Sequence, residues 1–108
     1  MNINEYQEKA RRTKNPAVSG WASAMEAALG IGSEAGEIIG IIDDWQFRGH
    51  ELNKAALVNE MGDLLWYLCE MCDYAGVQLA DVAENNIRKL ERRYPQGFTA
   101  DLRRGRVD

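Results

Sequence analysis

The sequence predicts an all-α protein, and three observations support that prediction. Apolar residues recur three and four positions apart over long stretches, which is the spacing of one face of a helix. No segment alternates apolar and polar residues with a period of two, so no sheet is expected. Short loops separate the predicted helices, and short loops force neighbouring helices to run antiparallel. We therefore expect an antiparallel arrangement resembling a four-helix bundle.

The first two helices occupy the N-terminal half of the chain. Asn4 can cap the first helix, with Gln7 at the capping-box position, and this helix should run to about Thr13. The segment "TKNPAVSG" at 13–20 then breaks it, because proline and glycine punctuate helices. A second helix is expected from about Trp21 to Trp45. Its apolar residues lie on helical spacings: Met25, Leu29, Ile38, Ile42 and Trp45.

Two further helices complete the chain. A third should run from about Leu52 to Tyr74, and Gly76 is well placed as its C-terminal cap. Its apolar residues again alternate by three and four: Val58, Met61, Leu65, Leu68 and Cys72. A fourth helix, about 79–93, stops before Pro95, and "RRGRVD" at 103–108 reads as a tail. A chain of 108 residues forms one domain, here 1–108 with a core at about 4–98.

Composition excludes several classes of function. A net charge of −4 argues against a partner that is a nucleic-acid polymer, since such proteins usually carry a basic patch. The polar N-terminus is not a secretory signal, and the longest apolar run, "LLWYLC" at 64–69, is too short to span a membrane. Cys69 and Cys72 have no Cys/His cluster to join, so we expect two buried thiols in a reducing cytoplasm.

Two acid pairs lie inside otherwise apolar helices. "GSEAGEIIG" at 32–40 holds Glu34 and Glu37, and "NEMGDLLWYL" at 59–68 holds Glu60 and Asp63. Residues three apart project from nearly the same side of a helix, so each pair concentrates like charge. Because the second and third helices should pack antiparallel, the two pairs can lie opposite each other.

No basic residue of these helices can neutralise the acids. Lys and Arg are absent from 21–47 and again from 55–87. The open possibilities are solvation, protonation, cations from another helix, or a divalent metal. Apolar neighbours disfavour solvation, and the stripe of Gly32, Gly36 and Gly40 indicates close approach of a backbone or a ligand. A cluster of carboxylates suits hard cations such as Mg²⁺ or Mn²⁺ rather than zinc.

Other candidate residues each have a plainer interpretation. Asn86, Lys89 and Arg93 share one face of the fourth helix and are expected to face inward at one end of the bundle. There they can meet phosphate groups or simply neutralise acids across the bundle. Trp66 or Tyr67, directly after the second acid pair, can flank a nucleobase by stacking, although aromatics at helical spacing more often pack in a core. Glu70 and Asp73 repeat the acidic spacing and are expected to face solvent.

The motifs resemble those of the MazG-like all-α nucleoside triphosphate pyrophosphohydrolases. The two acid pairs resemble the E-x-x-E and E-x-x-D signature of that family, in the same order. "NIRKLERRYPQGF" at 86–98 is similar to its N-x-x-K-L-x-x-R-Y-P-x-G-F ending, and "NEYQEKARRT" at 4–13 is similar to its opening helix. The resemblance covers about residues 4–98.

The resemblance implies a function and a set of residues. It implies Mg²⁺-dependent hydrolysis of a nucleoside triphosphate to the monophosphate and pyrophosphate, by a chain that self-associates as a dimer or tetramer. Glu34 or Glu37 would orient or activate the water, and Asn86, Lys89 and Arg93 would contact the nucleotide. The implied metal ligands are Glu34, Glu37, Glu60 and Asp63.

Two other functions remain open, as does the branch of the family. A module that binds a metal–nucleotide without turnover would keep the same acids, and a structural helical oligomer would leave them solvated. The resemblance does not select a nucleobase, and the dUTPase-like, dCTPase-like and phosphoribosyl-ATP pyrophosphohydrolase branches all stay possible.

Overall fold

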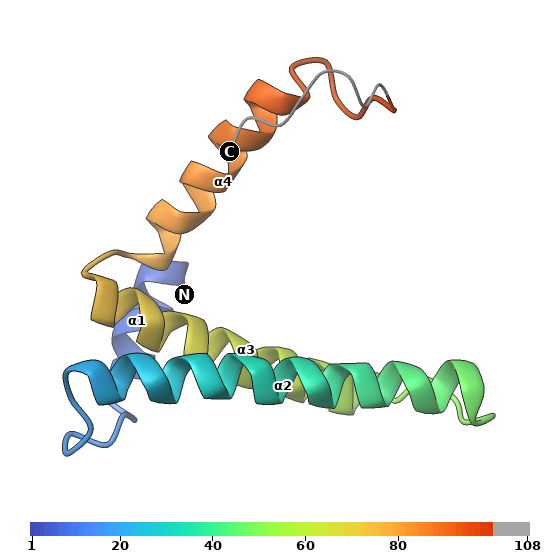
Figure 1. Ribbon diagram of the computed structural model, residues 1–108, viewed down its shortest axis with the longest axis horizontal. Helices are drawn as coiled ribbons and strands as arrows, with labels where there is room; N and C mark the ends of the chain where they lie inside the picture. Colours follow the sequence, from blue (N-terminus) through green and yellow to red (C-terminus); the bar gives the residue numbers. More distant parts are fainter. Residues whose placement is uncertain (101–108) are drawn as a thin grey trace.

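The computed structural model describes residues 1–100, and within them the chain is all-helical. The four helices are α1 (Ile3–Arg11), α2 (Trp21–Phe47), α3 (Lys54–Ala75) and α4 (Leu79–Arg93) (Figure 1). The predicted all-α class is confirmed, and the observed helix bounds lie close to the predicted ones. The predicted tail at 103–108 lies outside the described residues. Within residues 1–100, no helix combines the length and the apolar character needed to cross a membrane.

Local signals explain where the helices begin and end. The first helix starts earlier than predicted, because Asn2 rather than Asn4 caps it: the Asn2 side chain accepts a hydrogen bond from the Glu5 amide at 2.9 Å. Asn53 caps α3 in the same way, accepting from the Ala56 amide at 3.0 Å. Gly76 ends α3 in the left-handed conformation with φ of 74°, as expected for a C-terminal cap.

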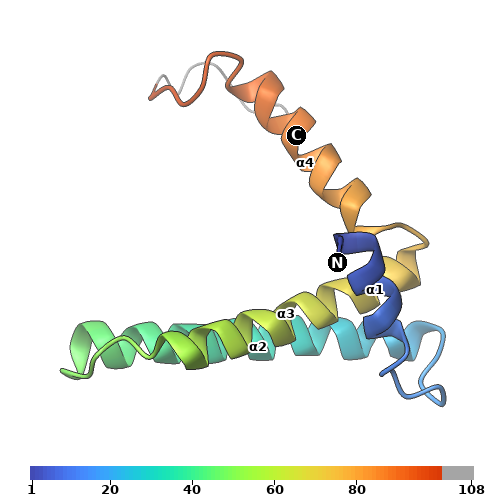
Figure 2. The same ribbon diagram turned by 180° about the vertical axis from the view of Figure 1, so that it is seen from behind.

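An antiparallel pair of long helices forms the frame of the molecule. α2 and α3 lie side by side and make the most extensive helix–helix contact in the described chain (Figures 1 and 2). α1 packs across the C-terminal part of α3, and α4 starts at the same corner and projects away from the pair (Figure 2). The radius of gyration is 17.1 Å, whereas a compact domain of this length has about 13 Å. One chain therefore does not close the predicted four-helix bundle.

The interior of a single chain is small. Among residues 1–100 the buried apolar residues are few: Ala10, Ala27, Cys69 and Cys72. The two cysteines are free and buried, as predicted, and burial is the main cause that raises the pKa of Cys69 to about 11. Much of the helical apolar pattern points outward instead. The exposed members are Met25, Leu29, Ile42 and Trp45 on α2, and Val58, Met61 and Leu68 on α3.

A buried glutamine holds the corner where α1, α3 and α4 meet. The Gln7 side chain, only 3% exposed, donates to Asp73 Oδ1 at 2.9 Å and to the Val77 carbonyl at 3.2 Å. Its own oxygen accepts a hydrogen bond from the Leu79 amide, in the first turn of α4, at 2.7 Å. This use of the amide explains why Gln7 does not serve in the capping box of α1. It also sets the point from which α4 departs.

Candidate metal and nucleotide site

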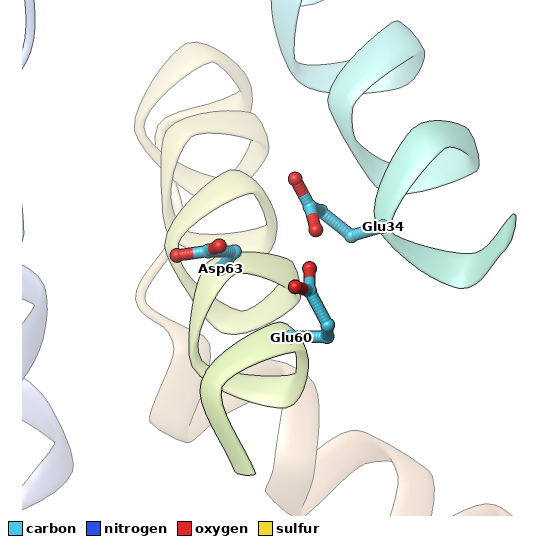
Figure 3. Close-up of side chains that lie close together, drawn as sticks. All are labelled: Glu34, Glu60 and Asp63. Atoms are coloured by element: carbon cyan, nitrogen blue, oxygen red, sulfur yellow. The ribbon is translucent and has the colours of Figure 1, made fainter. Parts of the chain in front are cut away.

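Three of the four predicted acids meet between α2 and α3. Glu34 projects from the middle of α2, and Glu60 and Asp63 project from successive turns of α3 (Figure 3). One carboxylate oxygen from each lies within 4.8 Å of the others. Glu34 and Glu60 are part-buried and Asp63 is exposed. The antiparallel packing of the two helices therefore produces the convergence that the acid spacing predicts.

The negative charges of these three acids repel one another, and no cationic side chain of the described residues offsets the repulsion. The pKa of Glu34 is raised to about 7, first by the Glu60 carboxyl, with which it can share a proton, then by burial and by neighbouring negative charges. Glu34 Oε2 is buried without a hydrogen-bond partner in the described structure. Among residues 1–100, no cationic side chain forms an ion pair with Glu34, Glu60 or Asp63.

Glu37 lies one turn further along α2 and is exposed. It does not belong to the group of three converging oxygens, but its charge is among the causes that raise the pKa of Glu34. Glu37 thus lies close enough to repel the Glu34 carboxylate, but its own oxygens lie outside the group of three.

The acids border an open cleft of about 400 Å³. Thr13, Glu34, Asp63, Trp66 and Tyr67 line it. Trp66, named from the sequence, therefore does lie beside the acids. Tyr67, the alternative to Trp66 as a stacking residue, lines the cleft too. Thr13 was not predicted as a site residue.

Tyr67 occupies the cleft because of a glycine on the opposite helix. A Cβ added to Gly30 would overlap the Tyr67 ring, so the ring packs directly on the backbone of α2. The predicted glycine stripe behaves differently, since nothing in the described chain lies within 4 Å of a Cβ built on Gly32, Gly36 or Gly40. Within the described chain no backbone approaches the stripe, and the approach of a ligand to it stays a prediction.

The structure separates the α4 candidates from the acids. Asn86 is exposed, and Lys89 and Arg93 are part-buried, all on the helix that projects away from α2 and α3 (Figure 1). Both Lys89 and Arg93 make polar contacts within the chain. The expectation that these residues face inward at one end of a bundle is wrong for a single chain, because α4 does not lie alongside α2 and α3.

Glu70 corrects a further expectation. It was predicted to face solvent, but it is 4% exposed and lies at the α2–α3 interface. Burial, followed by the nearby Glu26 carboxyl, raises its pKa to about 7, while Lys14 opposes that shift from 3.9 Å. Asp73 is part-buried and pairs with Arg11 at 2.7 Å. Burial opposes ionisation of Asp73, but the hydrogen bonds from Arg11 and Gln7 outweigh it and lower the pKa.

The donor set at the converging acids fits a hard divalent cation. It consists of carboxylate oxygens from two helices, one of them buried and unpartnered. Mg²⁺ and Mn²⁺ favour oxygen ligands, whereas the cysteines that zinc would prefer lie elsewhere on α3. A bound cation would also relieve the repulsion that raises the pKa of Glu34.

Comparison with known proteins identifies the family. A model described as the MazG nucleotide pyrophosphohydrolase domain matches residues 23–98, which include all of α3 and α4 and all of α2 except its first two residues. The chain is 29% identical over 105 residues to the gene 37 protein of Mycobacterium phage L5, with 90% of this chain and 92% of that protein covered. No solved structure matches significantly. Because the family match spans most of the chain and includes every converging acid, the protein belongs to the MazG nucleotide pyrophosphohydrolase domain family.

Proposed function

We propose that this chain is a Mg²⁺-dependent nucleoside triphosphate pyrophosphohydrolase that releases a nucleoside monophosphate and pyrophosphate. The observation that carries the proposal is the convergence of Glu34, Glu60 and Asp63 beside an open cleft, without a cationic side chain to pair them among residues 1–100. Membership of a nucleotide pyrophosphohydrolase family supports the reaction class. A reducing cytoplasm, in keeping with the two free thiols, is the proposed location.

The converging acids are the proposed metal ligands. Glu34, Glu60 and Asp63 would hold Mg²⁺, with Mn²⁺ as a possible substitute, and Glu37 would join from the next turn of α2. The bound cation would neutralise phosphate charge and lower the pKa of an attacking water. Glu34 or Glu37 would orient that water and accept its proton, since both carboxylates lie on the α2 side of the cluster.

The cleft provides a place for the nucleoside. Trp66 lies next to the acids, so a base stacked on its ring would leave the phosphates within reach of the metal site. Asn86, Lys89 and Arg93 are the proposed phosphate and nucleotide contacts from α4. Because α4 projects away from the acids of its own chain, we assign these contacts to the α4 helix of a second copy.

Self-association as a dimer or tetramer follows from the same reasoning. α4 exposes an apolar face made of Val82, Ile87 and Leu90, and α2 and α3 expose large apolar side chains as well. Large apolar side chains left exposed in such number favour an interaction surface. A second copy that covers these faces would supply the missing bundle partners and complete the cleft.

The test is turnover by the wild type and by one ligand variant. Canonical, deoxy and modified triphosphates are screened for pyrophosphate release with Mg²⁺ and with EDTA. Glu60→Gln should keep the far-ultraviolet circular dichroism of the wild type and lose Mg²⁺-dependent release by at least a hundredfold, since the transition-state charge loses its counter-ion. The matched control is Glu51→Gln, which removes an exposed loop carboxylate and should keep full activity.

The same experiment separates the competing functions. Full activity in Glu60→Gln would contradict the ligand assignment. Binding of Mg²⁺ and triphosphate without pyrophosphate release would instead indicate a non-catalytic binding module. A structural oligomer predicts no rise of the melting temperature with Mg²⁺, whereas any ligand that binds the native state must raise it.

A further inference from the structure

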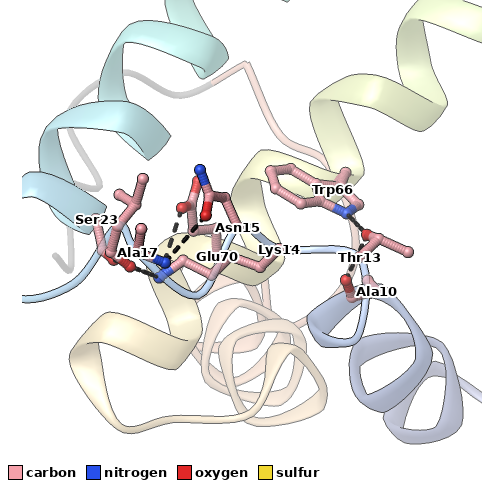
Figure 4. Close-up of polar contacts among 9 residues, drawn as sticks. Ala10, Thr13, Lys14, Asn15, Ala17, Ser23, Trp66 and Glu70 are labelled. Atoms are coloured by element: carbon pink, nitrogen blue, oxygen red, sulfur yellow. Dashed lines mark hydrogen bonds and ion pairs between the residues drawn. The ribbon is translucent and has the colours of Figure 1, made fainter.

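The Trp66 indole is held by a hydroxyl group from a distant part of the chain. Its Nε1–H donates to Thr13 Oγ1 at 2.7 Å, across 53 positions of sequence (Figure 4). The Thr13 hydroxyl in turn donates to the Ala10 carbonyl at 2.7 Å. Indole nitrogen is a donor only, and a hydroxyl has a single hydrogen to give. The Trp66 donor is thus fully used, and the direction of the Thr13 hydroxyl is set by the last turn of α1.

A second contact holds the indole from the side. The Trp66 and Tyr67 rings meet edge to face, with centroids 5.2 Å apart and planes at 89°. Tyr67 cannot easily move, because its ring packs on the α2 backbone at Gly30. The indole is therefore fixed at its nitrogen by Thr13 and beside its ring by Tyr67, and all three side chains line the cleft that holds Glu34 and Asp63.

We propose that Thr13 is a positioning residue that fixes the Trp66 indole as a flat wall on which the nucleobase of the substrate stacks. The inference deepens the proposed function and depends on it for the identity of the ligand. Because the Trp66 N–H is already bonded, the wall binds the base by its face and not by a hydrogen bond to its edge. Stacking suits every base, since each has a π face.

The proposal predicts a specific kinetic pattern. Losing the Thr13 hydroxyl frees the indole and weakens binding of the base, while the carboxylates on the phosphate side stay in place. Thr13→Val is the isosteric change that removes the hydroxyl, and Thr13→Ser keeps it. We expect KM to rise roughly three- to tenfold in Thr13→Val, the range of one hydrogen bond, for every triphosphate that is turned over. kcat should stay within about twofold of the wild type, because the phosphate site is unchanged.

Two controls isolate the effect of Trp66. Ser19→Ala removes another hydroxyl from the same connecting segment, outside the Thr13–Trp66 pair, and should leave both constants unchanged. Trp66→Phe keeps a flat ring and lacks the N–H, so adding Thr13→Val to it should raise KM no further. An equal effect of Thr13→Val in both backgrounds would show that Thr13 does not act through Trp66, and would overturn the inference even if the variant were less stable.

A binding measurement does not depend on turnover. In a Trp21→Phe, Trp45→Phe background, Trp66 is the only tryptophan and its emission reports the cleft. An α,β-imido triphosphate with Mg²⁺ should quench that emission, with roughly three- to tenfold weaker affinity in Thr13→Val than in the parent. Equal affinity in the two proteins, or no response of Trp66 at saturation, would overturn the inference. If the wild type releases no pyrophosphate, the proposed function fails and this titration still decides the role of Thr13.

Discussion

The carboxyl group of Glu34 on α2 faces that of Glu60 on α3 (Figure 3), and this contact is the first cause that raises the pKa of Glu34 to about 7. Two helices that run antiparallel have placed like charges together in a part-buried position. Such an arrangement is stabilised by a proton at low pH or by a cation at higher pH. A proton and a bound cation would therefore compete for the same oxygens.

Metal affinity should fall as the pH falls through neutrality. A carboxylate must be ionised to bind a metal, and a group with a pKa of about 7 is mostly protonated at pH 6. We expect the affinity for Mg²⁺, measured by calorimetric titration without nucleotide, to be about tenfold weaker at pH 6 than at pH 8. Glu34→Gln should bind weakly at both values. An affinity that does not change with pH would contradict competition between the proton and the cation.

Removing the charge of Glu70 should stabilise the protein at alkaline pH. The folded-state pKa is raised from 4.5 to about 7, so the folded chain holds a proton there more strongly than the unfolded chain. The contribution of protonated Glu70 to the free energy of unfolding is fully present below pH 4.5. It is lost as the pH rises through about 7. At pH 8 we expect Glu70→Gln to be more stable than the wild type by on the order of 1 kcal/mol, with little difference at pH 5.

The sign of that effect depends on Lys14, the cation nearest to Glu70. Lys14 keeps two other partners when the charge is removed: it donates to the Val18 carbonyl at 2.8 Å and to Ser23 Oγ (Figure 4). Its distance to Glu70 is the longer 3.9 Å. Glu26 and Asp73 both oppose ionisation of Glu70, so neutralising it relieves two repulsions and weakens one pair. Urea unfolding of both proteins at pH 5 and pH 8 measures the outcome, and destabilisation of Glu70→Gln at pH 8 would show that the Lys14 pair dominates.

A methyl group at Gly30 should disturb both the fold and the cleft. The added Cβ would overlap the Tyr67 ring, which must then leave its place on α2. We expect Gly30→Ala to lower the free energy of unfolding by about 1–3 kcal/mol, as overpacking does, and to weaken triphosphate binding. The matched control is Gly40→Ala on the same helix, where nothing in the described chain lies within 4 Å of the new Cβ.

The control has its own expected result. In a helix interior, alanine in place of glycine stabilises by about 0.5–1 kcal/mol when nothing contacts the methyl group. Gly40→Ala should therefore be more stable than the wild type in chemical denaturation. Equal destabilisation by the two substitutions would show that overlap with the Tyr67 ring is not what destabilises Gly30→Ala.

Much of the fold and the centre of the site could be predicted from local sequence patterns. Apolar spacing located four helices, and acids three apart on antiparallel neighbours predicted that Glu34 would meet Glu60 and Asp63. The cap of α1 was misassigned because "NINEYQ" contains two acceptable spacings, Asn2 with Glu5 and Asn4 with Gln7. Only the packing of α1 on α3, which uses the Gln7 amide, distinguishes them.

Contacts between segments that are distant in the sequence could not be predicted from local patterns. Glu70 has the same spacing to Asp73 as Glu60 has to Asp63, yet the register of α2 buries it near Glu26 and Lys14. Nothing local in the sequence pairs Thr13 with Trp66, or Tyr67 with Gly30. The chain leaves α3 through the left-handed conformation of Gly76, and the first amide of α4, at Leu79, is bonded to the distant Gln7.

The hydrogen bond between the Leu79 amide and the Gln7 side chain should help to attach the start of α4. Replacing Gln7 with Leu keeps the bulk of the side chain but leaves the Val77 carbonyl and the Leu79 amide without their partner. Buried groups that lose hydrogen bonds are costly, so we expect a loss of about 2–4 kcal/mol in the free energy of unfolding. In Gln7→Leu the Leu79 amide should also exchange with deuterium faster than it does in the wild type, because the start of α4 opens locally. Glu8→Gln, an exposed change at the next position, should alter neither quantity. Unchanged exchange at Leu79 in Gln7→Leu would mean that α4 is held by its contacts with α1 and α3 and not by this side chain.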